Sequence, residues 1–418
     1  MSSVTTVAPQ RVLASRVLSV DVLRGLTIAL MILVNDPGDW AHTYSQLDHA
    51  AWNGFTLTDL VFPNFLFLVG ASIIFSIDSR IARGESKRTL ALHMVRRAFT
   101  IFAIKMLLTA FPHFHLTHLR IFGVLTRIAV CYLIAGLICL YTRRARTLLA
   151  ISAALLVGYW ALMRFVPVPG FGIPTHDMPI LDPERNLAAW LDRGFNAFTQ
   201  RWLHTGTLYN RTHDPEGLLS TIPSIATTLL GSVTALWLRR AHQNSERSQG
   251  STPIPAVQIL RVLVLCGILG LMFGLLWSFT VPINKNLWTS SYVLFAAGWS
   301  FLLLALCYWL IDIRSLNRTQ AGKALLRPWL IFGSNAITAY VISNFLVEVA
   351  LWIKVPAGAL VNAAAPATRI TAWQWTYRHI FARHDSTNVT SLAFALAFVA
   401  LCFLPNLLLW RKKIFLKV

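Results

Sequence analysis

About ten apolar segments, each near the ~20 residues with which a helix crosses a bilayer, constrain this chain most strongly. Only 13% of the 418 residues are charged, whereas soluble domains carry about 25%. We therefore predict an all-α polytopic membrane protein in which residues 1–418 form a single transmembrane domain. The spans are expected near Leu18–Asn35, Thr58–Ile77, Leu90–Phe111, Ile121–Tyr141, Thr147–Val166, Leu218–Leu238, Ile259–Val281, Leu287–Ile311, Trp329–Ile353 and Ser391–Trp410.

The distribution of Lys and Arg predicts the orientation of these spans. Basic residues gather after the second, fourth, sixth and eighth spans and at the end of the chain, as in cytoplasmic loops. Both termini are therefore expected in the cytoplasm, and the net charge of +20 is assigned to these loops rather than to nucleic-acid binding. A long connection at about 167–217 then faces outside, and its segment Ala188–Trp202 could form an interfacial helix. The polar first ~16 residues predict no cleaved signal peptide.

The stretch LDHAAWNGFTLTDLVFP, residues 47–63, lies on the outer side between the first two spans and combines several polar side chains. His49 is the best candidate for chemistry, because an imidazole can take up a proton near neutral pH. Asn35 could donate a hydrogen bond to a developing oxyanion. Asp48 or Asp59 could orient the imidazole. On composition alone, a solvated loop histidine is the stronger interpretation.

Charged residues inside the spans require partners, because burying a charge in a membrane is costly. Asp21 and Arg24 share a helix face, either as an ion pair that fixes packing or as a ligand contact. Arg127 lies too deep in its span to reach the membrane surface. Its partner could be a carboxylate, backbone carbonyls or an anionic ligand.

Two outer connections contain further polar residues. Asn284, Lys285 and Asn286 could bind the hydroxyl and amide groups of a sugar, or form an ordinary solvated turn. The histidines of residues 113–118 are not accompanied by a carboxylate or a cysteine, so we predict no metal site.

Seven stretches in order resemble the transmembrane family of heparan-alpha-glucosaminide N-acetyltransferase. The resemblance covers nearly the whole chain and implies acetyl transfer from acetyl-CoA to the amine of a glucosamine-type sugar. The stretches are SVDVLRGLTIALMILVN (19–35), HAAWNGFTLTDLVFPNFLFLVG (49–70), LRIFGVLTRIAVCYL (119–133), DPEGLLSTIPSI (214–225), VPINKNLWTSSYV (281–293), GSNAITAYV (333–341) and RKKIFLKV (411–418).

The resemblance also implies roles for individual residues. The HAAWNG motif makes His49 the active-site histidine, and the VN pair maps an asparagine of the family to Asn35. Asp59 is the third catalytic candidate, as a carboxylate that could orient the imidazole. Sugar contacts are expected from Trp52, Asn53 and residues 284–286. The phosphates of CoA are expected near Arg24, Arg127, Lys413 and Lys417.

The expected setting is a bacterial inner membrane, with acetyl-CoA supplied from the cytoplasm and the active site facing the periplasm. The chain is shorter than the lysosomal member and looks like a bacterial version of the family, and bacterial relatives are often linked to the turnover of amino sugars. A small amino sugar or a muropeptide-type glycan is therefore expected as acceptor, and a homodimer is implied by analogy. Direct transfer and an acetyl-histidine intermediate both remain open. Two further alternatives are an amino-sugar transporter without chemistry and an O-acetyltransferase of surface glycans.

Overall fold

The computed structural model describes residues 17–247, 255–356 and 369–416, and these are almost entirely helical. A single short antiparallel pair, β1 (Lys354–Pro356) with β2 (Arg369–Thr371), is the sheet within these ranges. The all-α class is therefore confirmed. The helices are α1 (Leu18–Asn35), α2 (Leu57–Ile81), α3 (Lys87–Ala110), α4 (Val124–Tyr141), α5 (Ala145–Phe165), α6 (Leu187–Leu203), α7 (Thr221–Arg247), α8 (Ala256–Ser278), α9 (Ser290–Tyr308), α10 (Gln320–Ser334), α11 (Ala336–Trp352), α12 (Ala372–Thr376) and α13 (Asn388–Arg411).

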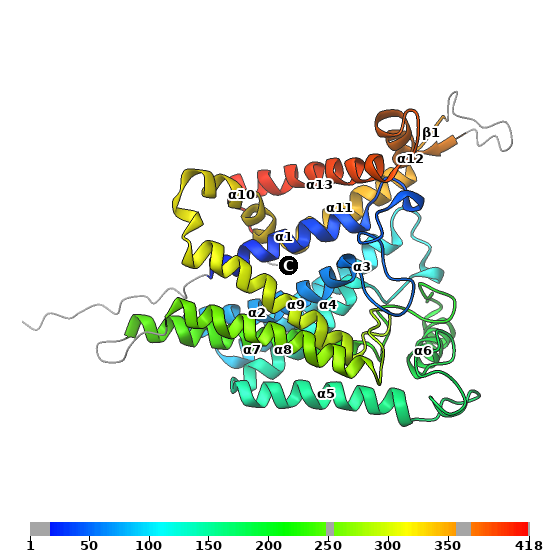
Figure 1. Ribbon diagram of the computed structural model, residues 1–418. Coiled ribbons are helices and arrows are strands. Elements are labelled where there is room, and N and C mark those ends of the chain that lie inside the picture. The colour runs from blue at the N-terminus through cyan, green and yellow to red at the C-terminus, as the bar shows by residue number, and fades with distance from the viewer. Residues whose placement is uncertain (1–16, 248–254, 357–368, 417–418) are drawn as a thin grey trace, which may run out of the picture.

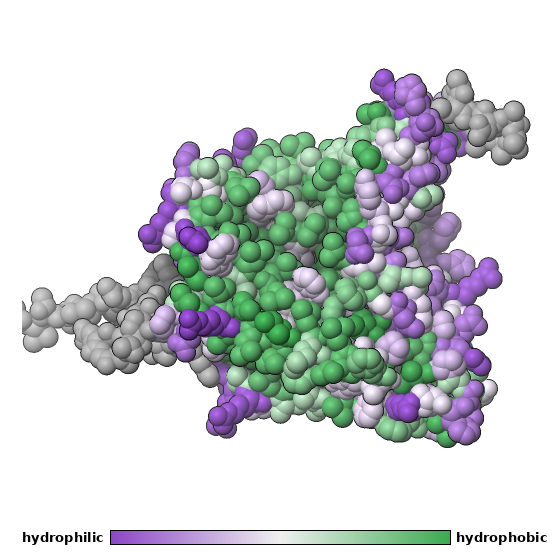
Figure 2. Space-filling view, viewed as in Figure 1, coloured by the Kyte–Doolittle hydropathy of each residue, from purple (hydrophilic) through white to green (hydrophobic). Residues whose placement is uncertain are grey.

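The long helices form a bundle with an apolar band between two polar ends (Figures 1 and 2). We call the end that carries Arg80, Arg96 and Arg143 the basic end. The opposite end, which carries the loop 36–56 together with α6 and α12, is the His49 end. An apolar band of this kind is expected of a polytopic membrane protein, because this part of its surface contacts the lipid chains.

Among the described residues, eight helices are long and apolar enough to cross a membrane, or nine if α10 and α11 count as one bent span. Helix α3 has 24 residues but five Lys or Arg side chains, which lower its apolar content below that of the other spans. The prediction of one continuous span over Trp329–Ile353 is wrong, because α10 ends at Ser334 and α11 starts at Ala336 at an angle of 79°.

The break is centred on Asn335, whose backbone leaves the helical region at φ −132° and ψ 45°. Its side-chain amide donates to the carbonyl of Ile414 at 3.1 Å and accepts from the N–H of Leu416 at 2.9 Å. The tail of the chain is therefore joined to the break. Because these partners are about 80 residues away in the sequence, their contribution to the break is not visible locally.

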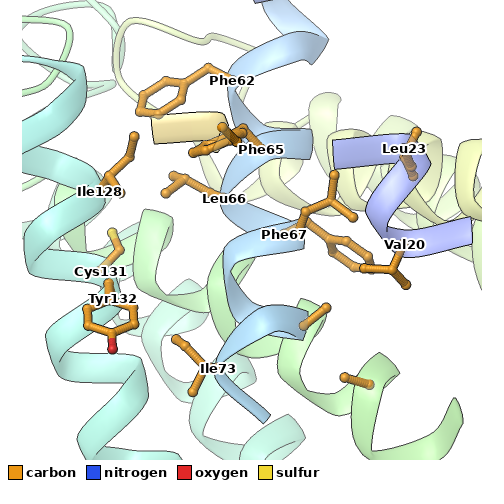
Figure 3. Packing of buried hydrophobic residues seen from close by; sticks show 14 of the residues in the cluster. Val20, Leu23, Phe62, Phe65, Leu66, Phe67, Ile73, Ile128, Cys131 and Tyr132 are labelled. Atoms are coloured by element: carbon orange, nitrogen blue, oxygen red, sulfur yellow. The ribbon is translucent and has the colours of Figure 1, made fainter. Parts of the chain in front are cut away.

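Helix α2 is the centre of the bundle and contacts α1, α4, α7 and α9. Figure 3 shows Phe65, Leu66 and Phe67 of α2 between side chains of α1 and α4. In its most apolar stretch, 83% of the residues are buried, against 22% for α8, which lies at the periphery. The segment that follows His49 is thus held by the most buried helix of the protein.

Glycines allow the backbones of α2 and α7 to touch. A Cβ added at Gly70 would lie 1.8 Å from the carbonyl oxygen of Thr228, and one added at Gly231 would lie 1.8 Å from that of Phe67. Small residues at such crossings are typical of membrane bundles, because close backbones gain van der Waals contact.

We expect Gly70→Ala to lower the free energy of unfolding by about 3 kcal/mol, since the methyl group can be accommodated only by separating two helices. The measurement is thermal unfolding in detergent. Gly158→Ala is the matched control, because a Cβ there meets nothing within 4 Å. Equal melting temperatures for the two variants would contradict the close packing of α2 and α7.

Candidate active site at the His49 end

His49 lies on the loop 36–56, and its imidazole is fixed by a buried carboxylate. Nδ1 of His49 is 2.8 Å from Oδ1 of Asp59. The Asp59 side chain is 1% exposed, whereas that of His49 is 39% exposed. The carboxylate is therefore withdrawn into the protein while the ring stays accessible, as a proton-transferring histidine requires.

Local structure explains why Asp59 is so well placed. Thr56 caps the N-terminus of α2, and Asp59 completes the capping box. Oδ2 of Asp59 accepts hydrogen bonds from the backbone N–H groups of Ala50 and Thr56, both at 3.0 Å. Its backbone carbonyl accepts from the hydroxyl of Tyr292 at 2.5 Å. The second oxygen of the carboxylate thus positions the loop, which leaves the first for the imidazole.

Asp48, the other carboxylate considered for this role, has a different contact. Its Oδ1 accepts from the backbone N–H of His49 at 2.7 Å. The structure therefore pairs the imidazole with Asp59 and leaves Asp48 as a support of the loop backbone.

Lys285 approaches the same pair from the turn between α8 and α9. Its Nζ lies 3.2 Å from both ring nitrogens of His49 and 3.8 Å from Oδ1 of Asp59. Burial lowers the pKa of Lys285, and the nearby carboxylates of Glu216 and Asp59 oppose that shift. Lys285 thus adds an amine to the His49–Asp59 pair.

The other residues predicted to contact the sugar mainly form hydrogen bonds between loops. Asn284 is fully buried and donates to the carbonyl of Trp52 at 3.0 Å and to Oδ1 of Asn53 at 3.2 Å. Trp52 donates from Nε1 to the carbonyl of Leu181 at 2.8 Å. Asn286 is half-buried, and its side chain makes no hydrogen bond to the described residues. Of these five residues, the structure brings Lys285 to the reactive ring.

Asn35 ends α1 and lines a cavity of about 600 Å³ at the His49 end. We call this the Asp36 cavity. It is bounded by residues 35–40, the end of α11 and residues 373–386. No hydrogen bond joins Asn35 to His49 in the described part of the chain, so the role of Asn35 in the reaction stays a prediction.

Two adjoining cavities of about 520 and 680 Å³ lie at the basic end, and we call them the basic cavities. Both are lined by Arg24 and Arg80, the first also by Arg96 and Arg97, and the second by Arg83. The first cavity also includes the start of α11 at residues 335–337. The unpaired N–H groups and dipole of a helix start favour an anion.

The predicted cofactor contacts differ in how well they match these cavities. Arg24 lines both, although it also pairs with Asp21 at 2.8 Å and donates to Ser72 and to the carbonyl of Gly333. Lys413 lines neither cavity. Lys417 lies outside the described residues.

Arg127 lines neither basic cavity, and its side chain is held by contacts inside the protein. Its guanidinium donates to the hydroxyl of Ser220 and to the carbonyl of Gly217, and it lies 4.9 Å from the ring centroid of Trp288. Of the partners considered from sequence, backbone carbonyls are therefore present, and a contact with a cofactor stays a prediction.

Sequence reasoning did not bring Arg80, Arg83, Arg96 and Arg97 together as the lining of cavities. It assigned them only to a basic connection, and it overlooked the helix start at Ala336. A signal was available in Arg96 and Arg97, because two arginines within a predicted span are unusual unless they face a polar cavity.

The profile of a protein family described as "Heparan-alpha-glucosaminide N-acetyltransferase, catalytic" matches residues 16–279, which is more than half of the chain. The chain belongs to this family. It is 30% identical over 375 residues to the heparan-alpha-glucosaminide N-acetyltransferase of Homo sapiens and 31% identical over 371 residues to that of Mus musculus.

These alignments cover 79% and 78% of this chain and 53% of each relative. The chain thus spans about half the length of the curated relatives that it matches. The match to the family includes α1 to α8, and so contains His49, Asp59 and most residues of the basic cavities. The family resemblance recognised in the motifs is confirmed.

Proposed function

We propose that this protein is a membrane acetyltransferase that transfers acetyl from acetyl-CoA, bound from the cytoplasm, to the amine of a glucosamine-type sugar at the outer face. The observation that carries the proposal is the His49–Asp59 pair, at 2.8 Å, in a chain of this family. The basic cavities at the opposite end support it, because they offer a site for an anionic donor.

In the reaction, the sugar amine attacks the thioester carbonyl. Nδ1 of His49 is occupied by Asp59, so Nε2, which lies 3.2 Å from Nζ of Lys285, is the nitrogen that removes the proton of the amine. Asp59 then stabilises the imidazolium. The C–S bond breaks as the amide forms, and His49 returns the proton to the departing thiolate. In the alternative route, Nε2 carries the acetyl group before the amine receives it.

The basic cavities are the proposed site for the phosphates of CoA. Arginines suit phosphate because a planar guanidinium gives two parallel charge-assisted hydrogen bonds. Arg24 and Arg80 border both cavities, and the start of α11 adds backbone N–H groups. This placement makes the basic end cytoplasmic and the His49 end periplasmic in a bacterial inner membrane.

Arg96 is the arginine most available to a phosphate. It lines the first cavity, and its guanidinium makes no hydrogen bond or ion pair to the described residues. Arg80 is instead paired with Glu85 at 3.0 Å, and Arg97 lies 4.7 Å from the ring of Tyr132.

We expect Arg96→Gln to raise the KM for acetyl-CoA about tenfold, since one charge-assisted contact is lost, and to leave kcat nearly unchanged. Steady-state kinetics in detergent with varied acetyl-CoA measure both. Arg88→Gln is the control, because Arg88 is exposed on the same helix and lines neither cavity. If the two variants have the same KM, Arg96 does not bind the donor.

The test of the function itself is acetyl transfer by the purified protein to a panel of amino sugars. Product must form with glucosamine and not with N-acetylglucosamine, which has no free amine. Product from N-acetylglucosamine would indicate an O-acetyltransferase. Flux of the sugar into liposomes without any acetylated product would indicate a transporter.

A further inference from the structure

An amine of the protein itself lies where the proposed reaction needs an amine. Nζ of Lys285 is 3.2 Å from Nε2 of His49, the nitrogen that removes a proton in that reaction. In the tautomer that donates from Nδ1 to Oδ1 of Asp59, Nε2 holds a lone pair and accepts an N–H of the lysine. Among the lysines that the structure describes, Lys285 alone has its amine within hydrogen-bond distance of an imidazole.

Hydrogen bonds between two loops fix this lysine relative to the histidine. The N–H of Gly54 donates to the carbonyl of Ile283 at 2.7 Å, and Nδ2 of Asn284 donates to the carbonyl of Trp52 at 3.0 Å. Ile283 and Asn284 come directly before the lysine, while Trp52 and Gly54 follow the histidine in its own loop. The two reactive side chains therefore start from backbone segments that are joined to each other, and their approach is preorganised.

The surroundings of Lys285 favour its action as a nucleophile. A lysine attacks a carbonyl group only in its neutral form, because the ammonium has no lone pair. The side chain is 16% exposed, and burial lowers the pKa of Lys285, which favours the neutral amine. The carboxylates of Glu216 and Asp59 oppose this shift of the pKa, and His49 is the adjacent group that can take up the proton.

We propose that Lys285 is a site of self-acetylation, at which the protein transfers acetyl from the donor to its own lysine when no sugar amine occupies the site. Nζ attacks the thioester carbonyl, its proton passes to Nε2 of His49, and the C–S bond breaks as the amide forms. His49 returns the proton to the thiolate, so the products are acetyl-lysine and the free thiol of CoA. The inference rests on the proposed function, because it uses the same donor and the same base.

The modification ends the activity of the chain that carries it. An amide is not a reactive acyl donor, so acetyl-lysine is not an intermediate on the way to the sugar. Acetylation removes the charge and the basic nitrogen of Lys285 and adds an acetyl group beside Nε2, where the sugar amine must arrive. A sugar amine protects the protein, since both amines compete for one base.

The probe is acetyl-CoA alone, added without any sugar to the full chain purified in detergent. Peptide mass spectrometry is expected to find the mass of one acetyl group on the peptide that contains Lys285. The acetylated fraction should be at least about tenfold lower in His49→Ala, because that variant lacks the base. The control site is Lys354, which is exposed at the same end of the protein and lies beside no imidazole of the described residues. Its acetylation should be equal in both proteins.

Two further measurements use the wild type alone, so they do not depend on the folding of a variant. Saturating glucosamine, added together with acetyl-CoA, should lower the acetylated fraction at Lys285 about tenfold through competition for His49 and leave that at Lys354 unchanged. After incubation with acetyl-CoA alone, the fraction of sugar-transfer activity that is lost should equal the fraction of chains acetylated at Lys285.

An unmodified Lys285 in wild-type protein that acetylates glucosamine would overturn this inference and leave the proposed function intact. Equal acetylation of Lys285 in the wild type and in His49→Ala would also overturn it. If Lys285 is acetylated through His49 but no sugar is ever acetylated, the self-acetylation stands and the proposed function fails. If neither amine is acetylated, both fail.

Discussion

His49→Ala is expected to lower kcat for acetyl transfer about 10³-fold, because it removes the group that accepts the proton of the amine. The direct and the acetyl-histidine routes give the same result, since both use Nε2. The measurement is product formation from acetyl-CoA and glucosamine by protein purified in detergent, with the melting temperature of each variant recorded alongside.

The control for this variant is His176→Ala. His176 also pairs with a carboxylate, with 2.6 Å between its Nδ1 and Oδ1 of Asp177, but its side chain is 82% exposed and lies in the connection before α6. It therefore reproduces the loss of an imidazole–carboxylate pair without touching the proposed site. If both histidine variants keep full activity, His49 is not the base.

Asp59→Asn is expected to reduce kcat about 10²- to 10³-fold while the protein stays folded. An amide can still accept the two backbone N–H groups, but it cannot stabilise the imidazolium and can hold the ring in the wrong tautomer. Kinetics with saturating acetyl-CoA measure the loss, and thermal unfolding verifies that the cap of α2 is retained.

Asp48→Asn is the matched variant, because it lies beside His49 and keeps an acceptor for the backbone N–H of that residue. It should retain most of the activity. A larger loss in Asp48→Asn than in Asp59→Asn would reverse the assignment of the orienting carboxylate.

The apolar pattern predicted the bounds of a helix well where both of its ends are marked by nearby residues. Helix α1 has the predicted bounds, Leu18–Asn35, because an apolar run and a polar terminus are both visible in the sequence. The role of Asp59 could also have been predicted, because Thr56 and Asp59 have the spacing of a capping box. A capping box draws the carboxylate toward the loop that carries His49. That signal would have separated Asp59 from Asp48.

The cavities could not be predicted, because each collects residues that are far apart in the sequence. Arg24, Arg96, Ala336 and Leu416 border the same space although they come from four different segments. Arg96 carries a local signal, since it is one of two arginines within a predicted span, but the sequence around these residues does not indicate that the four segments meet. The Asp36 cavity likewise joins the end of α1 to residues 373–386, so a single sequence gives Asp36 the look of an ordinary loop carboxylate.

The contacts of Asn335 with Ile414 and Leu416 have a consequence for biosynthesis. Leu416 borders both basic cavities and follows α13 in the chain, whereas α1, which supplies Arg24, is translated long before it. The wall of these cavities is therefore completed only when translation reaches residue 416. A nascent chain can insert its earlier helices and still lack the part of this wall that residue 416 supplies, so the basic cavities are complete only after α13 has been made.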